Sequence, residues 1–190
     1  MSTTATLRSA VFPRATIYSK ALLVAFGTFF MAGLAQIALP VPGSPVPVTG
    51  QTLGVLLIGA SYGMQLGATT LLTYLVVGLA GAPVFAKGAH GLVQFTGPTG
   101  GYLIGMLFAS LLVGALAGRK WDQKLRSALP AMLLGDVVIF VFGLYWLHAY
   151  THQGWSWTIS AGFTPFIIGE VLKIAIAGTS LPLVWRFVQR

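Results

Sequence analysis

The sequence predicts an all-α, polytopic membrane protein that forms one membrane-embedded domain over residues 1–190. Hydrophobic residues make up 56% of the chain, charged residues only 7%, and the mean hydropathy is +0.84. Soluble domains carry far more charge, so this composition favours lipid as the solvent of most residues. The apolar runs are continuous, whereas a transmembrane barrel needs segments of alternating polarity. The chain is therefore expected to cross the membrane as helices.

Four apolar runs are long enough to be transmembrane helices, which need about 20 apolar residues to cross the hydrocarbon layer. They are Lys20–Ala38, Tyr102–Gly118, Leu129–Tyr150 and Pro165–Trp185. The segment 1–17 is polar to mildly basic and lacks the apolar core and cleavage site of a signal peptide. A cytoplasmic start is therefore expected, with the first span kept as an anchor.

The apolar stretch Thr52–Ala80 is predicted to be a hairpin of two short helices. Its middle, Tyr62–Gly67, holds two glycines and a glutamine, which fits either one long helix or a tight turn. Loop charge separates these alternatives, because lysine and arginine in short loops stay on the cytoplasmic side. A hairpin places nine basic residues inside and only Lys87 outside, whereas a single span places four inside and six outside. The hairpin is favoured, which gives six transmembrane helices with both termini cytoplasmic. The nine inner residues are Arg8, Arg14, Lys20, Arg119, Lys120, Lys124, Arg126, Arg186 and Arg190.

The formal net charge of +8 does not indicate nucleic-acid binding. The basic residues fall almost wholly between or outside the apolar runs, where they orient the chain and contact anionic headgroups. Cysteine is absent, which excludes disulfides and thiol catalysis. The sequence also lacks the G-x-x-x-x-G-K-[ST] and H-E-x-x-H motifs. No enzyme activity, metal site or cofactor is therefore predicted.

Three ionisable residues lie inside predicted spans, where such residues usually mark a functional site. Glu170 and Lys173 are three positions apart on the last span, so they share one helix face and present both signs of charge to one cavity. A ligand with an anion at one end and amide-like donors at the other would satisfy both. A purely structural ion pair is the alternative, although such a pair seldom offsets its own desolvation. Asp136 is expected near the cytoplasmic end of its span, on the far side from this pair, and is interpreted as structural.

The loops predicted on the outer side combine proline, glycine and single aromatic residues. Segment 39–50 has four prolines within eight residues, which favours a stiff, extended lid or pocket wall. Segments 83–91 and 97–102 hold glycines that let the backbone approach a ligand, together with Phe85 and Tyr102, which could cover an apolar ring. Exposed turns use the same residue types, so composition alone fits a binding site and simple turns equally well.

Four motifs in this order resemble the BioY family, the biotin-specific S components of energy-coupling-factor (ECF) transporters. They are Pro47–Thr52, Gly81–Ala86 with its glycine-rich continuation, Gly97–Tyr102 and Gly169-Glu170-x-x-Lys173. The likeness extends over residues 18–188. The family commonly has aspartate as the acid of the last motif, where this sequence has Glu170.

The resemblance implies a six-helix bundle in the cell membrane that captures biotin at its outer face. It implies partnership with a membrane coupling protein and a pair of cytoplasmic ATPases, which are separate chains. It also implies that Ala21 and Ala25, which lie four residues apart on the first helix, meet the coupling protein, because small residues at this spacing admit another helix closely. An S component for another small vitamin is the alternative. The oligomeric state is left open, with a homo-oligomer among the options.

The expected ligand contacts follow from the chemistry of biotin, which has a carboxylate at one end and a ureido ring with N–H donors at the other. Lys173 can meet an anion, and Glu170 can accept N–H bonds. Aromatic rings would cover the fused ring and its thioether. The predicted substrate-binding residues are Thr49, Gln51, Phe85, Gly91, Gly100, Tyr102, Glu170 and Lys173.

Overall fold

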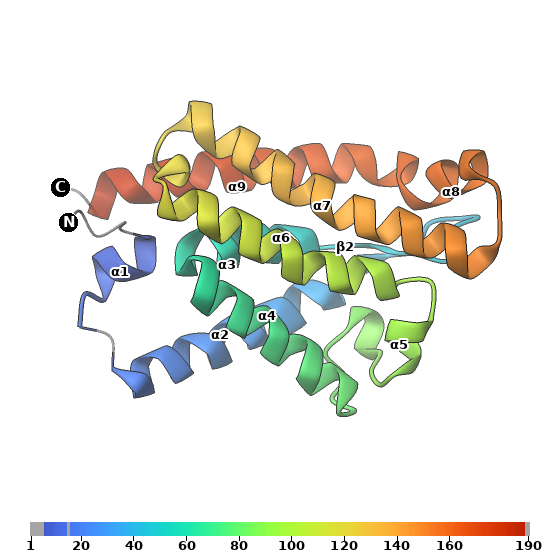
Figure 1. The fold of residues 1–190 in the computed structure, drawn as a ribbon, viewed down its shortest axis with the longest axis horizontal. Coiled ribbons are helices and arrows are strands. Elements are labelled where there is room, and N and C mark those ends of the chain that lie inside the picture. The colour runs from blue at the N-terminus through green and yellow to red at the C-terminus, as the bar shows by residue number, and fades with distance from the viewer. Residues whose placement is uncertain (1–5, 15, 189–190) are drawn as a thin grey trace.

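The structure, a computed structural model, describes residues 6–14 and 16–188 of the chain. Within these ranges, six helices run lengthwise and pack into a bundle (Figure 1). They are α2 (Ile17–Gln36), α3 (Gln51–Tyr62), α4 (Met64–Leu79), α6 (Gly100–Gly118), α7 (Leu125–Thr151) and α9 (Ile167–Val188). The shorter elements lie at the two ends: α1 (Leu7–Val11), α5 (Val93–Thr96), α8 (Trp155–Gly162), β1 (Ala38–Leu39) and β2 (Val48–Thr49).

The predicted long apolar helices are confirmed, with shifted ends. The helices long and apolar enough to cross a membrane are Ile17–Gln36, Gly100–Gly118, Leu125–Thr151 and Trp155–Val188, the last of which comprises α8 and α9. The final helix does not begin at Pro165 as predicted, because the 3₁₀ turn Thr164–Phe166 holds this proline near its start and α9 follows from Ile167. Helix α8 was not predicted.

The stretch Thr52–Ala80 is broken at Gly63 into α3 and α4, which run in opposite directions, as the hairpin prediction required (Figure 1). Gly63 has a φ of 80°, in the region that favours glycine, and its N–H donates to Gly59 O at 3.0 Å. The two helices also approach closely. A methyl group added at Gly67 would lie 3.2 Å from Gly59 Cα. Glycine therefore provides both the turn and the close packing of the hairpin.

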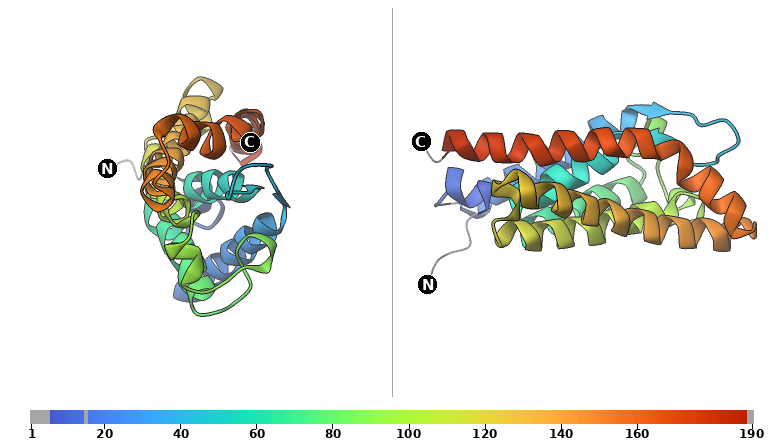
Figure 2. Two further views of the ribbon diagram at one scale, coloured as in Figure 1. Left: turned by 90° about the vertical axis from the view of Figure 1, so that its right-hand side faces the viewer. Right: turned by 90° about the horizontal axis from the view of Figure 1, so that it is seen from above.

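Helix α3 occupies the middle of the bundle, with the other long helices around most of it (Figure 2). It packs against α6, α4, α9 and α2. Eight of its 12 residues are buried. Helix α2 is the opposite case, because it buries only Gly27, Thr28, Met31 and Ala35 and leaves most of its apolar surface exposed.

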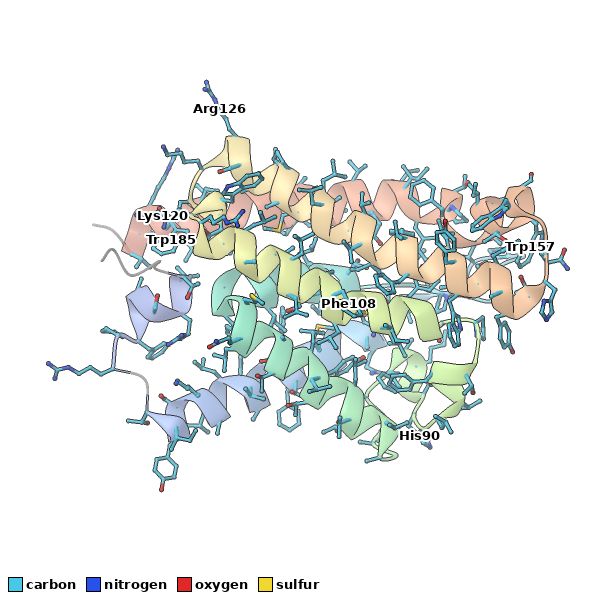
Figure 3. The ribbon with its side chains drawn as sticks, in the orientation of Figure 1. His90, Phe108, Lys120, Arg126, Trp157 and Trp185 are labelled. Carbon is cyan, nitrogen blue, oxygen red and sulfur yellow. The ribbon has the colours of Figure 1, made fainter. Side chains whose placement is uncertain are left out.

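The two ends of the bundle differ in their elements and charge. Helix α1, the α3–α4 turn, the α6–α7 connection and the end of α9 lie at one end, together with Lys120 and Arg126 (Figures 1 and 3). The β1–β2 hairpin, α5 and α8 lie at the other end, with His90 and Trp157 (Figure 3). The elements predicted for the inner side and those predicted for the outer side thus lie at opposite ends of the bundle (Figures 1 and 3). Arg190, one of the nine predicted inner residues, lies outside the described residues.

The α6–α7 connection is tied to α9 by a buried carboxylate at the basic end. Asp122 lies in the 3₁₀ turn Trp121–Gln123, is 1% exposed, and accepts a hydrogen bond from Trp185 Nε1. Its Oδ1 atom has no hydrogen-bond partner among residues 6–14 and 16–188. Burial raises the pKa of Asp122 to about 6, although the hydrogen bond from Trp185 opposes this shift.

We expect Asp122 to lower the stability of the protein as the pH rises. Because its folded pKa lies above the ordinary value of about 4, the folded state binds the proton more tightly than the unfolded state does. The free energy of unfolding should therefore fall as pH increases through this range, and the fall should be complete above the folded pKa. Asp122→Asn keeps an acceptor for Trp185 and should remove this part of the pH dependence.

Thermal unfolding in detergent at a series of pH values measures the effect as the difference between wild type and Asp122→Asn. Asp122→Ala serves as the control, since it also loses the hydrogen bond and should be less stable than Asp122→Asn at every pH. Parallel pH profiles for wild type and Asp122→Asn would contradict the expectation.

Candidate functional site

A cavity of about 480 Å³ lies at the end of the bundle that carries the β1–β2 hairpin. Its wall includes the connection 40–47 between the two strands, and prolines 40, 45 and 47 are among the lining residues. Short segments at 85–87 and 93–99 complete the rim, and α3, α6, α7 and α9 contribute the deeper lining. The predicted pocket wall is therefore present. It is not extended throughout, because the chain turns at Pro42–Gly43, where Ser44 N–H donates to Val41 O at 3.1 Å.

A hydrogen-bonded triangle of charged and polar groups joins two helices beside this cavity. Lys173 Nζ lies 2.7 Å from Glu170 Oε1 and donates to Thr52 Oγ1 at 3.0 Å. Thr52 Oγ1 in turn donates to Glu170 Oε2 at 2.8 Å. The side chains of Lys173 and Glu170 are only 12% and 7% exposed. The predicted pairing on one face of the last helix is confirmed, and α3 supplies the third member.

Thr52 and Glu170 belong to the cavity lining, whereas Lys173 does not. Lys173, which was predicted to contact the substrate, therefore does not line the cavity and can affect it only through Glu170 and Thr52. Its ammonium group holds both in place, so the cavity presents a fixed carboxylate and a fixed hydroxyl.

Asp136 stands beside this triangle, and the prediction that it lies on the far side from Glu170 and Lys173 is wrong. It is 5% exposed. The ring of Phe140 in α7 contacts that of Phe166, with centroids 5.7 Å apart. Because α7 and α9 run in opposite directions (Figure 1), Asp136 and Glu170, each four residues from this contact toward the basic end, face one another. Helix α7 has 27 residues, so Asp136 is 11 residues from its start at Leu125 and about 16 Å along the helix. The cluster thus contains two acids and one base.

Thr49 and Gln51 line the cavity as part of a second polar network. Gln51 Nε2 donates to Tyr74 Oη at 2.9 Å, and Tyr74 Oη donates to Val84 O at 3.0 Å. Thr49 Oγ1 donates to Gln51 Oε1 at 3.1 Å. These bonds link α3, α4 and the segment before Phe85. They also fix the orientation of the Gln51 amide.

The two predicted aromatic residues line the cavity from different elements. Phe85 is 2% exposed and packs edge-on against Tyr74, with ring centroids 5.4 Å apart. Tyr102 packs edge-on against Phe140 at 5.9 Å and donates from its hydroxyl to Gly162 O at 2.8 Å. Both rings therefore hold fixed positions in the wall.

Glycines make room for these rings. A methyl group at Gly78 would lie 2.2 Å from Phe85 Cζ, and one at Gly143 would lie 2.3 Å from the Tyr102 ring. Any larger residue at either position would push the ring toward the cavity.

Gly91 and Gly100, which were also predicted to bind substrate, are not among the lining residues. Gly91 has a φ of 80° and donates its N–H to Gly78 O at 2.8 Å, so it shapes the loop after α4. A methyl group at Gly100 would lie 1.9 Å from Phe95 O, which indicates tight packing of the α5–α6 connection. Both positions support the rim from outside the lining.

Sequence reasoning did not select several residues that line the cavity or hold its rim. Thr52 is the last residue of the motif Pro47–Thr52, and Phe166 directly follows the proline predicted to start the last helix, so both lay beside residues that the sequence had already singled out. Nothing in the sequence around Gln36 indicated a role at the site. Its side chain nevertheless donates to Phe85 O at 3.2 Å and accepts from Gly88 N at 2.9 Å, which ties the 85–88 segment to α2. In the described part of the chain, no group of three or more metal-ligating residues is gathered.

We expect Lys173→Met to destabilise the protein, because removing one partner of a buried ion pair leaves an uncompensated charge, at a cost of about 3–5 kcal/mol. Adding Glu170→Gln to this variant should recover part of the loss. Thermal unfolding of the single and double variants in detergent measures the coupling between the two side chains. Lys87→Met is the matched control, since Lys87 is exposed on the rim and has no ion pair among the described residues. Equal unfolding temperatures for wild type and Lys173→Met would argue against a coupled pair.

Comparison with known proteins places this arrangement in a family. The BioY family profile matches residues 3–190. The biotin transporter BioY2 of Lactococcus lactis is 34% identical over 165 residues, which cover 84% of this chain and 87% of that protein. A probable biotin transporter BioY of Pyrococcus horikoshii is 36% identical over 143 residues, covering 75% and 82%.

The fold agrees with these matches. A crystal structure of the S-component for biotin from an ECF-type ABC transporter superposes with a TM-score of 0.81 at 27% identity, covering 90% of this chain and 95% of that one. A family profile that spans nearly the whole sequence, relatives above 30% identity and a shared fold lead to one conclusion: this chain belongs to the BioY family.

Proposed function

We propose that the protein captures biotin in the cavity beside Glu170 and carries it across the cell membrane as the substrate-binding subunit of an ECF-type transporter. The observation that carries this proposal is the fixed Glu170–Thr52–Lys173 triangle at an apolar, aromatic-walled cavity. Cavities of this size, mostly apolar with a few convergent polar groups, are typical small-molecule sites. The names of the relatives point to biotin as that molecule.

The cavity is chemically suited to biotin. The Glu170 carboxylate can accept N–H bonds from a ureido ring, and Thr49 and Gln51 add fixed polar groups nearby. Phe85 and Tyr102 provide flat apolar surfaces for the fused rings. Lys173 supports this site from behind by holding Glu170 and Thr52.

In this proposal the six helices of the bundle form the transmembrane domain, with α3 and α4 shorter than a full span and both termini on the cytoplasmic side. The concentration of basic residues at the end that holds Lys120 and Arg126 supports this orientation (Figure 3). Helix α3 has only 12 residues, which span about 18 Å, less than the hydrocarbon thickness of about 30 Å. A short central helix leaves space above it, so the cavity would be recessed below the outer membrane surface.

Energy for uptake would come from a membrane coupling protein and a pair of cytoplasmic ATPases, as the partnership of ECF transporters implies. The exposed face of α2 supports a docking role. Ala21 and Ala25 are both exposed and lie toward the end of the bundle that carries Lys120. Packing within the described chain does not use them, which leaves their strip open to another helix.

Isothermal titration calorimetry on the detergent-solubilised protein tests the ligand. We expect biotin to bind with one site per chain. Glu170→Ala should weaken binding about 10- to 100-fold, because a hydrogen bond to a charged group contributes about 1.5–3 kcal/mol. Glu170→Asp keeps the charge and should be less affected than Glu170→Ala. Heat with riboflavin or thiamine, and none with biotin, would assign the cavity to another vitamin.

A second experiment tests coupling. The double variant Ala21→Trp with Ala25→Trp should bind biotin almost normally but lose copurification with the coupling protein and ATP-driven uptake. Leu22→Trp with Phe26→Trp is the matched control, because it adds aromatic bulk to another exposed face of α2, about 100° around the helix. Persistent uptake by the alanine double variant would place the coupling surface elsewhere, and loss of folding would identify the strip as internal packing.

A further inference from the structure

The acidic cluster behind the cavity has an excess of one negative charge if all its groups are ionised. It comprises Asp136 from α7, Glu170 and Lys173 from α9, and the hydroxyl of Thr52 from α3. Helices α3 and α6, which pack against α9 and α7, carry no acidic or basic residue, and Asp122 of the turn Trp121–Gln123 lies at the basic end with Trp185 as its partner. The only titratable group of α6, Tyr102, donates its hydroxyl to Gly162 O, and that of α3, Tyr62, donates to Leu23 O. The net charge of the cluster therefore depends only on the protonation of its two carboxyl groups and one ammonium group.

The hydrogen bonds show which acid is already compensated. Glu170 uses both oxygens, one for Lys173 at 2.7 Å and one for Thr52 at 2.8 Å. Asp136 is 5% exposed, and its Oδ1 atom has no hydrogen-bond partner among residues 6–14 and 16–188. A buried, ionised carboxylate without donors would be costly, and the Glu170 carboxylate that faces it from α9 makes it more so.

We propose that Asp136 holds a proton at neutral pH and donates it in a hydrogen bond to Glu170, so that the cluster is neutral and Asp136 acts as a positioning residue for the Glu170 carboxylate. A carboxylic acid that faces a carboxylate can donate a strong, charge-assisted hydrogen bond to it, whereas two carboxylates repel. The proton thus gives Glu170 a third partner besides Lys173 and Thr52. Loss of this proton would replace that hydrogen bond with repulsion between two carboxylates and would add a negative charge beneath the cavity.

Infrared difference spectroscopy on the purified protein tests the protonation state without any ligand. A protonated carboxyl group has a carbonyl stretch separate from the carboxylate bands. We expect this band in the wild type at neutral pH and its loss in Asp136→Asn. It should also disappear in Glu170→Gln, because Asp136 would then be the only acid beside Lys173 and would ionise. Asp122→Asn is the matched control, since it makes the same change at the other end of the bundle and should keep the band.

Two spectroscopic outcomes would overturn the proposal. Absence of the band in the wild type at neutral pH would mean that both acids are ionised. A band that persists in Asp136→Asn but disappears in Glu170→Gln would place the proton on Glu170.

Biotin affinity measured over pH provides the functional readout, and this arm rests on the proposed function. Affinity should fall at alkaline pH in the wild type and in Asp122→Asn, but not in Asp136→Asn, whose amide cannot lose its donor. Asp136→Asn should also bind biotin about tenfold more tightly than Asp136→Ala, because only the former can donate to Glu170. Equal affinities of these two variants, or an alkaline fall in Asp136→Asn, would contradict the positioning role. If no variant binds biotin, the proposed function fails, while the infrared result still decides the protonation of Asp136.

Discussion

A charged pair inside an apolar bundle must be satisfied by protein groups, because neither lipid nor packed hydrocarbon can solvate it. The arrangement of the long helices around Glu170 and Lys173 follows from this constraint. Helix α9 carries both charges, and the N-terminal turn of α3 brings Thr52 to bridge them. Helix α7 brings Asp136 alongside. The cavity opens where these helices meet, so the polar groups needed for internal balance are also the ones available to a ligand.

The apolar part of the site depends on small residues in neighbouring helices. Gly78 leaves the space that Phe85 fills, and Gly143 and Gly162 do the same for Tyr102. These rings pack against further rings, so they cannot collapse into the cavity. Close packing on one side of each ring therefore maintains open volume on the other, in keeping with the high packing density of protein interiors.

Much of this architecture could be predicted from the sequence. Lipid excludes unpaired backbone, so continuous apolar runs had to be helices, and the distribution of lysine and arginine selected a break near Gly63. The i, i+3 spacing likewise placed Glu170 and Lys173 on one face. The position of Asp136 could not be obtained in this way. The sequence gives the distance of Asp136 from the start of its own helix. Whether that level matches the level of Glu170 depends on how far α7 and α9 are shifted along each other, which is set by the packing between them. Helix α8 was missed because its eight residues are far too few for a span.

The connection between β1 and β2 has a further consequence for ligand affinity. Proline locks φ at about −65°, so four prolines in this short segment leave its backbone few alternative conformations even before a ligand arrives. A flexible loop would have to be ordered on binding, and the lost conformational entropy would offset part of the contact energy. The restriction built into this segment is instead incurred when the protein folds. Contacts made against this side of the cavity therefore lose less of their free energy to ordering of the protein.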